Sequence, residues 1–186
     1  MSYEQQWQGL EGQLKAIQKI GPFNGYIRDG IANLAQWQQE IRPLFIGKEA
    51  YGASEGPHGG YSITEAGLDK DPVRHCRESP RSWQKTAYIG HALQHGLLPY
   101  NAAIRHSKKV YEALRTVAFI NVGKLGGETK TDPKKMKRLY AQNRLILHEQ
   151  IALCQPNVII GWNTLSHFEN DSDFMSRFGE RRSPKN

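Results

Sequence analysis

The sequence predicts a three-layer α/β/α protein built on a short central parallel sheet. Three short apolar runs, at 44–46, 117–122 and 158–161, are separated by longer segments with helical periodicity. Continuous apolar strands joined by helices are typical of parallel sheets covered on both faces. The chain has 186 residues, which is enough for one domain with a sizeable core.

Residues 1–43 are expected to form an N-terminal helical segment of the same domain. Apolar side chains at helical spacing predict a helix over 3–20, which Gly21-Pro22 ends. A second helix is expected over 29–41. It would end just before Pro43, because the residue that precedes a proline disfavours helical geometry.

Residues 44–165 form the expected α/β core. Helices are predicted over 81–96 and 101–115. A third helix is expected to begin at Asp132-Pro133, which supplies an N-cap and an early proline, and to end before Gln155-Pro156.

The last segment, 166–186, is polar, and we expect it to be a C-terminal tail. No fourth strand is apparent after Trp162. The sheet is therefore expected to be short.

Composition narrows the class of protein. The net charge is +7, and residues 70–150 carry 16 Lys and Arg against 6 Asp and Glu. A basic region of this kind favours a polyanion partner such as DNA, although a solvated charged face gives the same pattern. The sequence has neither a long apolar run nor a signal-like start, which predicts a soluble, cytoplasmic protein without a membrane partner.

Metal and cofactor sites find little support in the sequence. Cys76 and Cys154 are too few for a disulfide framework, an all-cysteine zinc site or a four-thiolate iron–sulfur cluster. His91 and His95 have helical i,i+4 spacing, but no third ligand accompanies them. We expect no metal and no cofactor.

Polar side chains stand where two of the expected strands end. Glu49 follows the first strand and can hold a water or offset a developing positive charge, or it is simply an exposed loop acid. Asn121 lies inside an apolar strand, where a buried amide needs a partner. Its amide can read a base edge or can pair with neighbouring backbone.

Further candidates lie close to these two residues. Tyr51 and Tyr61 bracket a glycine-rich loop and can stack on a planar ligand, although loop tyrosines often cover the core. Lys48 and Lys124 stand at strand ends, where they can contact phosphate or remain solvated.

Three segments together resemble the uracil-DNA glycosylase superfamily. The first runs from Leu44 through Glu49 and Tyr51 to Tyr61 and is similar to the family's strand, Gly-Gln-Asp-Pro-Tyr-His loop and following aromatic residue. The second, 119–124, is similar to the strand whose Asn reads the base. The third is the helix over 134–153 with the strand 158–161. Order and spacing agree across 44–165.

The resemblance implies a role for each matching residue. Glu49 stands where the family has its water-orienting Asp, and Tyr51 would press against the C5 edge of the base. Tyr61 would stack on the extruded base, and Asn121 would pair with its polar edge. The implied activity is hydrolysis of the N-glycosidic bond of a flipped uracil or other modified pyrimidine in single- or double-stranded DNA, which leaves an abasic site.

The chain also departs from the family pattern. Glu49 is one methylene longer than Asp, and no His-Pro dipeptide occurs in the sequence. In the family, that His donates to the departing base. An alternative function is therefore a catalytically inactive or weakened nucleic-acid-binding protein on the same fold, and a third is a small-nucleotide-binding α/β protein.

Overall fold

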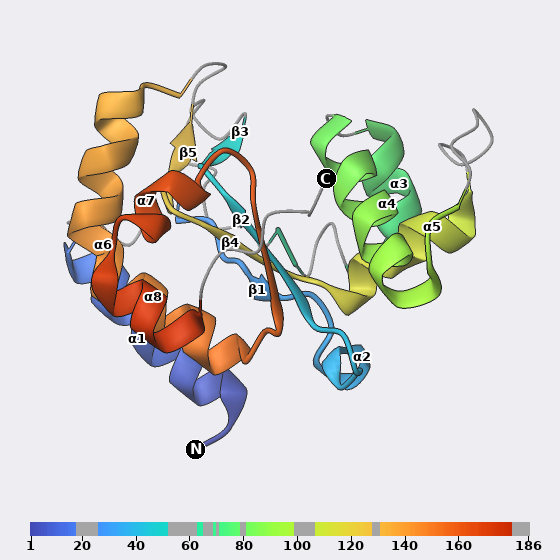
Figure 1. The fold of residues 1–186 in the computed structure, drawn as a ribbon, viewed down its shortest axis with the longest axis horizontal. Coiled ribbons are helices and arrows are strands. Elements are labelled where there is room, and N and C mark those ends of the chain that lie inside the picture. The colour runs from blue at the N-terminus through green and yellow to red at the C-terminus, as the bar shows by residue number, and fades with distance from the viewer. Residues whose placement is uncertain are drawn as a thin grey trace.

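The computed structural model contains a four-stranded mixed sheet at its centre (Figure 1). It describes residues 1–17, 26–51, 63–64, 69, 71–78, 81–98, 107–127 and 131–179. The strand order is β1-β4-β2-β6. The strands span Gly30–Ile31 (β1), Pro43–Gly47 (β2), Ala118–Asn121 (β4) and Val158–Gly161 (β6).

The three strands expected from the apolar runs are present and parallel. β2 pairs with β4 on one side and with β6 on the other. Every residue of β2 and β4 is buried, as continuous apolar strands require. The sheet as a whole is mixed and not purely parallel, because β1 pairs antiparallel with β4 at the edge.

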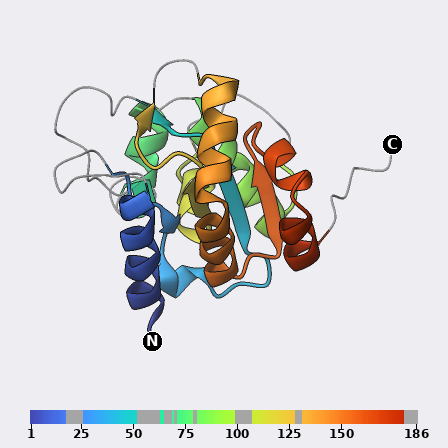
Figure 2. The ribbon, with the colours of Figure 1, turned by 90° about the vertical axis from the view of Figure 1, so that its left-hand side faces the viewer.

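Helices cover both faces of the sheet (Figures 1 and 2). One face packs against α1 (Tyr3–Ile17), α6 (Pro133–Cys154), α7 (Leu165–Glu169) and α8 (Ser172–Phe178). The other packs against α3 (Pro72–Glu78), α4 (Arg81–His95), α5 (Lys108–Glu112) and the 3₁₀ turn Ala113–Thr116. Two apolar cores result, one on each side, so the three-layer α/β/α expectation agrees with this arrangement.

The long helix α6 begins and ends where its sequence signals predict. The Asp132 side chain accepts a hydrogen bond from the backbone N–H of Lys134, and Pro133 occupies the first turn. At the other end Gln155 adopts the left-handed conformation (φ 50°), and Pro156 follows. α1 packs along α6 and buries Trp7 and Leu14.

The expected helix over 29–41 is wrong. Gly30 has φ of 126°, which a helix cannot contain, and it forms β1 together with Ile31. Only Leu34–Trp37 is helical (α2), and the Asn33 side chain caps it by accepting from the N–H of Gln36. The N-terminal segment therefore contributes a strand to the sheet as well as helices.

The expected polar tail, 166–186, is also wrong for its described residues, 166–179. They form α7 and α8, and Phe168 and Phe174 lie in the apolar core with at most 5% of their surface exposed. Asp171 begins α8 by accepting hydrogen bonds from the N–H groups of Asp173 and Phe174. Burial of the two rings, and not the average polarity of the segment, decides its structure.

A second, two-stranded sheet lies beside the carboxyl ends of the central strands. β3 (Ala50–Tyr51) pairs in parallel with β5 (Gly126–Gly127). This pairing ties the chain after β2 to the chain after β4. Among the described helices, none is both long and apolar enough to cross a membrane.

Candidate functional site

The chain segments that follow β2 and β4 lie side by side. Gly47 pairs with Asn121 in the register of the two strands. Beyond them, the N–H of Val122 donates to the Gly47 carbonyl at 3.0 Å, and the N–H of Gly123 donates to the Lys48 carbonyl at 2.7 Å. The carboxyl ends of parallel strands are where α/β proteins bind ligands. These hydrogen bonds therefore bring two predicted site residues, Glu49 and Asn121, to one edge of the sheet.

The backbone of Asn121 is held by a hydrogen bond, and no described residue pairs with its side chain. Its N–H donates to Asp29 Oδ2 at 2.7 Å, and the residue is 3% exposed. Within the described residues the side-chain amide makes no hydrogen bond, so the alternative that it pairs with neighbouring backbone finds no support there. Neither amide atom is among the fully buried, unpaired polar atoms of the described residues, so the amide is open to water or to a ligand.

Gly47 provides the space in which the Asn121 amide lies. A Cβ atom at position 47 would collide with Asn121 Oδ1 and would lie 2.7 Å from Cζ of Phe119. Any residue other than glycine would therefore displace the amide. Sequence patterns predicted no role for this glycine beyond ending a strand.

Lys124 does not lie at the surface, so the prediction that it contacts phosphate is wrong. Its side chain has no exposed area, and its Nζ lies 2.9 and 2.7 Å from Oδ1 and Oδ2 of the equally buried Asp29. Burial lowers the pKa of Lys124 and raises that of Asp29, and the attraction between the two charges opposes both shifts. The pair anchors the turn after Asn121 to the N-terminal segment.

Glu49 is a buried carboxylate, not an exposed loop acid. Its side chain is 4% exposed, and its Oε2 lies 2.9 Å from Nζ of Lys135 on α6. A Cβ placed on Gly123 would lie 3.3 Å from Cβ of Glu49, which sets the acid directly beside the chain that follows Asn121. No sequence pattern indicates Lys135 as the partner, because 86 residues separate the two.

Of the two predicted tyrosines, the structure describes only the backbone of Tyr51. Tyr51 belongs to β3 and its backbone pairs with Gly127, but its side chain lies outside the described residues, as does the whole of Tyr61. Lys48 is partly exposed at the end of β2. The pKa of His167 on α7 is lowered first by burial and then by the positive charges of Lys137 and Lys48.

Aromatic rings lie on the sheet face that carries Asn121, and sequence reasoning did not assign them to the site. Trp162 follows β6 and stacks on Phe45, with ring centroids 6.2 Å apart and an interplanar angle of 19°. Phe119, two residues before Asn121, packs against Trp83 of α4 at 4.6 Å. The alternation of side chains along a strand already placed Phe119 and Asn121 on one face, which was a usable signal.

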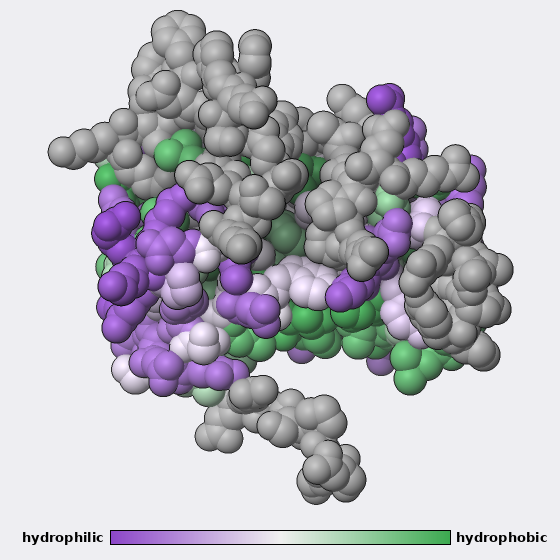
Figure 3. Space-filling view, turned by 90° about the horizontal axis from the view of Figure 1, so that it is seen from above, coloured by the Kyte–Doolittle hydropathy of each residue, from purple (hydrophilic) through white to green (hydrophobic). Residues whose placement is uncertain are grey.

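Basic side chains gather at the start of α6, next to Glu49. Lys134, Lys137 and Arg138 are exposed there, while Lys135 is engaged by Glu49. Seen from the strand-end side, hydrophilic residues cover the α6 side of the molecule (left in Figure 3). This charge is suited to the phosphates of a nucleic acid.

The two histidines of α4 do meet, as their spacing predicts. The rings of His91 and His95 have centroids 4.7 Å apart, and burial is the main cause that lowers the pKa of His91. No group of three or more His, Cys, Asp or Glu side chains suited to a metal exists within the described residues. The free cysteines Cys76 and Cys154 are buried.

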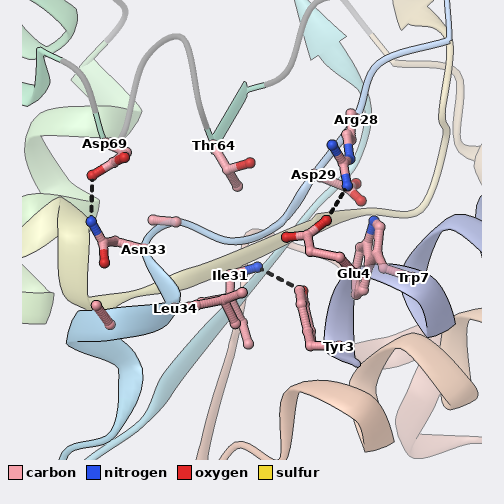
Figure 4. A pocket seen from close by; sticks show the side chains of 12 residues that line it. Tyr3, Glu4, Trp7, Arg28, Asp29, Ile31, Asn33, Leu34, Thr64 and Asp69 are labelled. Carbon is pink, nitrogen blue, oxygen red and sulfur yellow. Dashed lines mark hydrogen bonds and ion pairs between the residues drawn. The ribbon is translucent and has the colours of Figure 1, made fainter. Parts of the chain in front are cut away.

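A cavity of about 270 Å³ lies along α1, β1 and α2 and includes neither Glu49 nor Asn121 (Figure 4). The acids at its wall already have partners. Glu4 binds Arg28 at 2.6 Å, and Asp69 accepts from the side-chain amide of Asn33 at 2.8 Å. We therefore place the candidate site at the strand ends and not in this cavity.

Comparisons with known proteins add no family to this picture. No protein-family model, curated protein or solved structure matches the chain.

Proposed function

We propose that this protein is a DNA glycosylase that hydrolyses the N-glycosidic bond of a flipped uracil or other modified pyrimidine. The observation that carries the proposal is the side-chain amide of Asn121. It is buried, it has no partner among the described residues, and its backbone is fixed by Asp29. An amide offers a donor and an acceptor in one plane, which is what the polar edge of a pyrimidine requires.

Glu49 supplies the charge that this reaction needs. As the bond between the base and C1′ of the deoxyribose lengthens, the sugar becomes cation-like and the base departs as an anion. A buried carboxylate stabilises the cation and can orient the water that adds to C1′. The water's hydroxyl remains on the sugar, its proton neutralises the base, and an abasic site is left.

The basic start of α6 would hold the DNA backbone. Lys134, Lys137 and Arg138 are exposed next to the buried Glu49. Contacts to phosphate position the nucleic acid without reading sequence, so only the flipped base need be recognised at Asn121. Lys48 belongs to the same proposed phosphate contact, whereas Lys124 does not.

The proposal is tested with DNA that contains one uracil or one altered pyrimidine. The DNA, single- or double-stranded, is incubated with the protein and heated in alkali, which breaks the strand at abasic sites. We expect the wild-type protein to cause a break at the altered base. Glu49→Gln and Asn121→Ala should lose this activity. Glu40→Gln, the same change at an exposed acid, should keep it. Absence of breaks with a folded protein across a broad panel of bases would remove the proposal.

A second candidate is DNA binding without cleavage, and one contact favours it. The ion pair with Lys135 engages an oxygen of Glu49 that would otherwise be free to orient water. DNA binding without cleavage predicts that the affinity for DNA falls steeply as the salt concentration rises. It also predicts that no abasic product forms. An affinity for undamaged DNA that does not change with ionic strength would count against both candidate functions.

A further inference from the structure

Trp162 and Asn121 lie on opposite sides of the end of β2, in the row of residues at the strand ends. Register pairs Gly161 of β6 with Ile46, and the N–H of Trp162 donates to the Ile46 carbonyl at 2.9 Å. Trp162 therefore falls next to Gly47, whose neighbour on the other side is Asn121. Because Gly47 has no side chain, Asn121 and Trp162 flank it on one face of the sheet.

The indole of Trp162 has a donor that no described residue uses. Its Nε1 atom is buried and has no hydrogen-bond partner among the described residues, whereas the indole of Trp37 donates to the Cys154 carbonyl at 2.9 Å. An indole N–H is only a donor, so burial without an acceptor is unfavourable. Among the described residues, Trp7, His91 and Gln150 also carry unpaired buried atoms, but they lie on helices and not at the strand ends.

We propose that Trp162 is a specificity-determining residue that donates its indole N–H to a carbonyl oxygen of the bound base. The inference rests on the function proposed above for this site. An oxo group supplies the missing acceptor, whereas an amino group at the same place offers only donors and leaves the N–H unpaired. Asn121 and Trp162 together therefore select an oxo-pyrimidine over an amino-pyrimidine.

The packing of Trp162 makes this role separable from stability. Its ring stacks on the fully buried Phe45, and phenylalanine at position 162 keeps an aromatic ring there. Trp162→Phe removes a donor that binds nothing in the part of the chain that the structure describes. Trp37→Phe is the matched control, because the same change removes a hydrogen bond that the protein does use.

The first test follows the indole N–H signals of the full-length protein by ¹⁵N NMR, with Trp162→Phe identifying the signal of Trp162. Free uracil is the probe, and benzene, a ring without acceptor atoms, is the control. We expect uracil to move the Trp162 signal downfield in a saturable manner and benzene not to do so. A Trp162 signal that uracil leaves in place overturns the inference, whether or not uracil-containing DNA is cleaved.

The second test compares rates on uracil-containing DNA. We expect Trp162→Phe to lower kcat/KM about tenfold, the effect of losing one hydrogen bond to the substrate, with an unchanged melting temperature. Trp37→Phe should lower the melting temperature and leave kcat/KM unchanged. Cleavage by Trp162→Phe at the wild-type rate overturns the role of Trp162 alone, whereas wild-type protein that cleaves nothing overturns the proposed function.

Discussion

The side chains of Asp29 and Lys124 form an ion pair with no exposed area, although 95 residues separate them in the chain. The same carboxylate accepts the backbone N–H of Asn121 at 2.7 Å. The pair therefore joins the segment before β1 to the end of β4. Removal of one partner from such a pair leaves an uncompensated charge in the interior.

We expect Lys124→Met to lower the free energy of unfolding by about 3–5 kcal/mol, because the Asp29 carboxylate stays buried without its cation. The double variant Asp29→Asn/Lys124→Met should be more stable than Lys124→Met, since it buries no charge. Urea denaturation of the wild type, both single variants and the double variant measures this coupling. Additive losses in the double variant would contradict a direct pair.

Lys135→Met should lower the free energy of unfolding by about 1 kcal/mol, because it leaves the Glu49 carboxylate without its partner while Lys135 itself is 37% exposed and partly screened. Lys134→Met is the control, since Lys134 is exposed on the same turn of α6. Urea denaturation is again the measurement. Equal effects of the two substitutions would show that the contact with Glu49 contributes nothing to stability.

Asn121→Ala should separate function from stability. Because the side chain of Asn121 has no protein partner within the described residues, we expect a change of about 0.5 kcal/mol or less in unfolding free energy and a loss of base release. Asn143→Ala is the contrast, because the Asn143 side chain donates to the Val122 carbonyl at 3.1 Å and its loss should cost about 1 kcal/mol. A large destabilisation by Asn121→Ala would indicate a structural role for the amide.

His148 makes stability depend on pH. It is 1% exposed, and its pKa is lowered by burial first and by Arg144 and Arg177 next, against the opposing charges of Asp171 and Asp173. The folded state therefore binds a proton at His148 less readily than the unfolded state does. The stabilisation is complete above the unfolded pKa of about 6.5 and is lost as the pH falls below it toward the folded pKa.

We expect His148→Gln to reduce the loss of stability between about pH 7.5 and pH 5, the interval in which an unfolded histidine becomes protonated. His91 and His167, whose pKa values burial also lowers, should retain part of the dependence. Thermal unfolding at several pH values gives the slope. An unchanged slope in the variant would exclude His148 as a source.

The sequence predicts best the elements whose signals are local. β2, β4 and β6 follow from short continuous apolar runs, and the start of α6 follows from Asp132 and Pro133. β1 could not be predicted in this way, because two residues carry no periodicity and their pairing depends on β4. Its one local signal was Gly30, a residue that permits the positive φ found there.

Long-range pairs were beyond the reach of sequence patterns. Lys124 was predicted to be a surface charge because its partner Asp29 lies far away in the chain. Glu49 was open to interpretation as an exposed acid because its partner Lys135 is also distant in the sequence. Phe168 and Phe174 were hidden within a polar segment, although both belong to the core. Asn121 was recognised because an amide within an apolar strand conflicts with its surroundings, and such local conflicts often mark functional sites.

The central claim is that Asn121 and Glu49 release a base from DNA, and direct detection of the freed base tests it most directly. Chromatography of the reaction with uracil-containing DNA should show free uracil accumulating over repeated turnovers, with about a hundredfold slower release by Asn121→Ala or Glu49→Gln. No free base from the folded wild type on any altered pyrimidine, or release that neither substitution slows, would contradict the account.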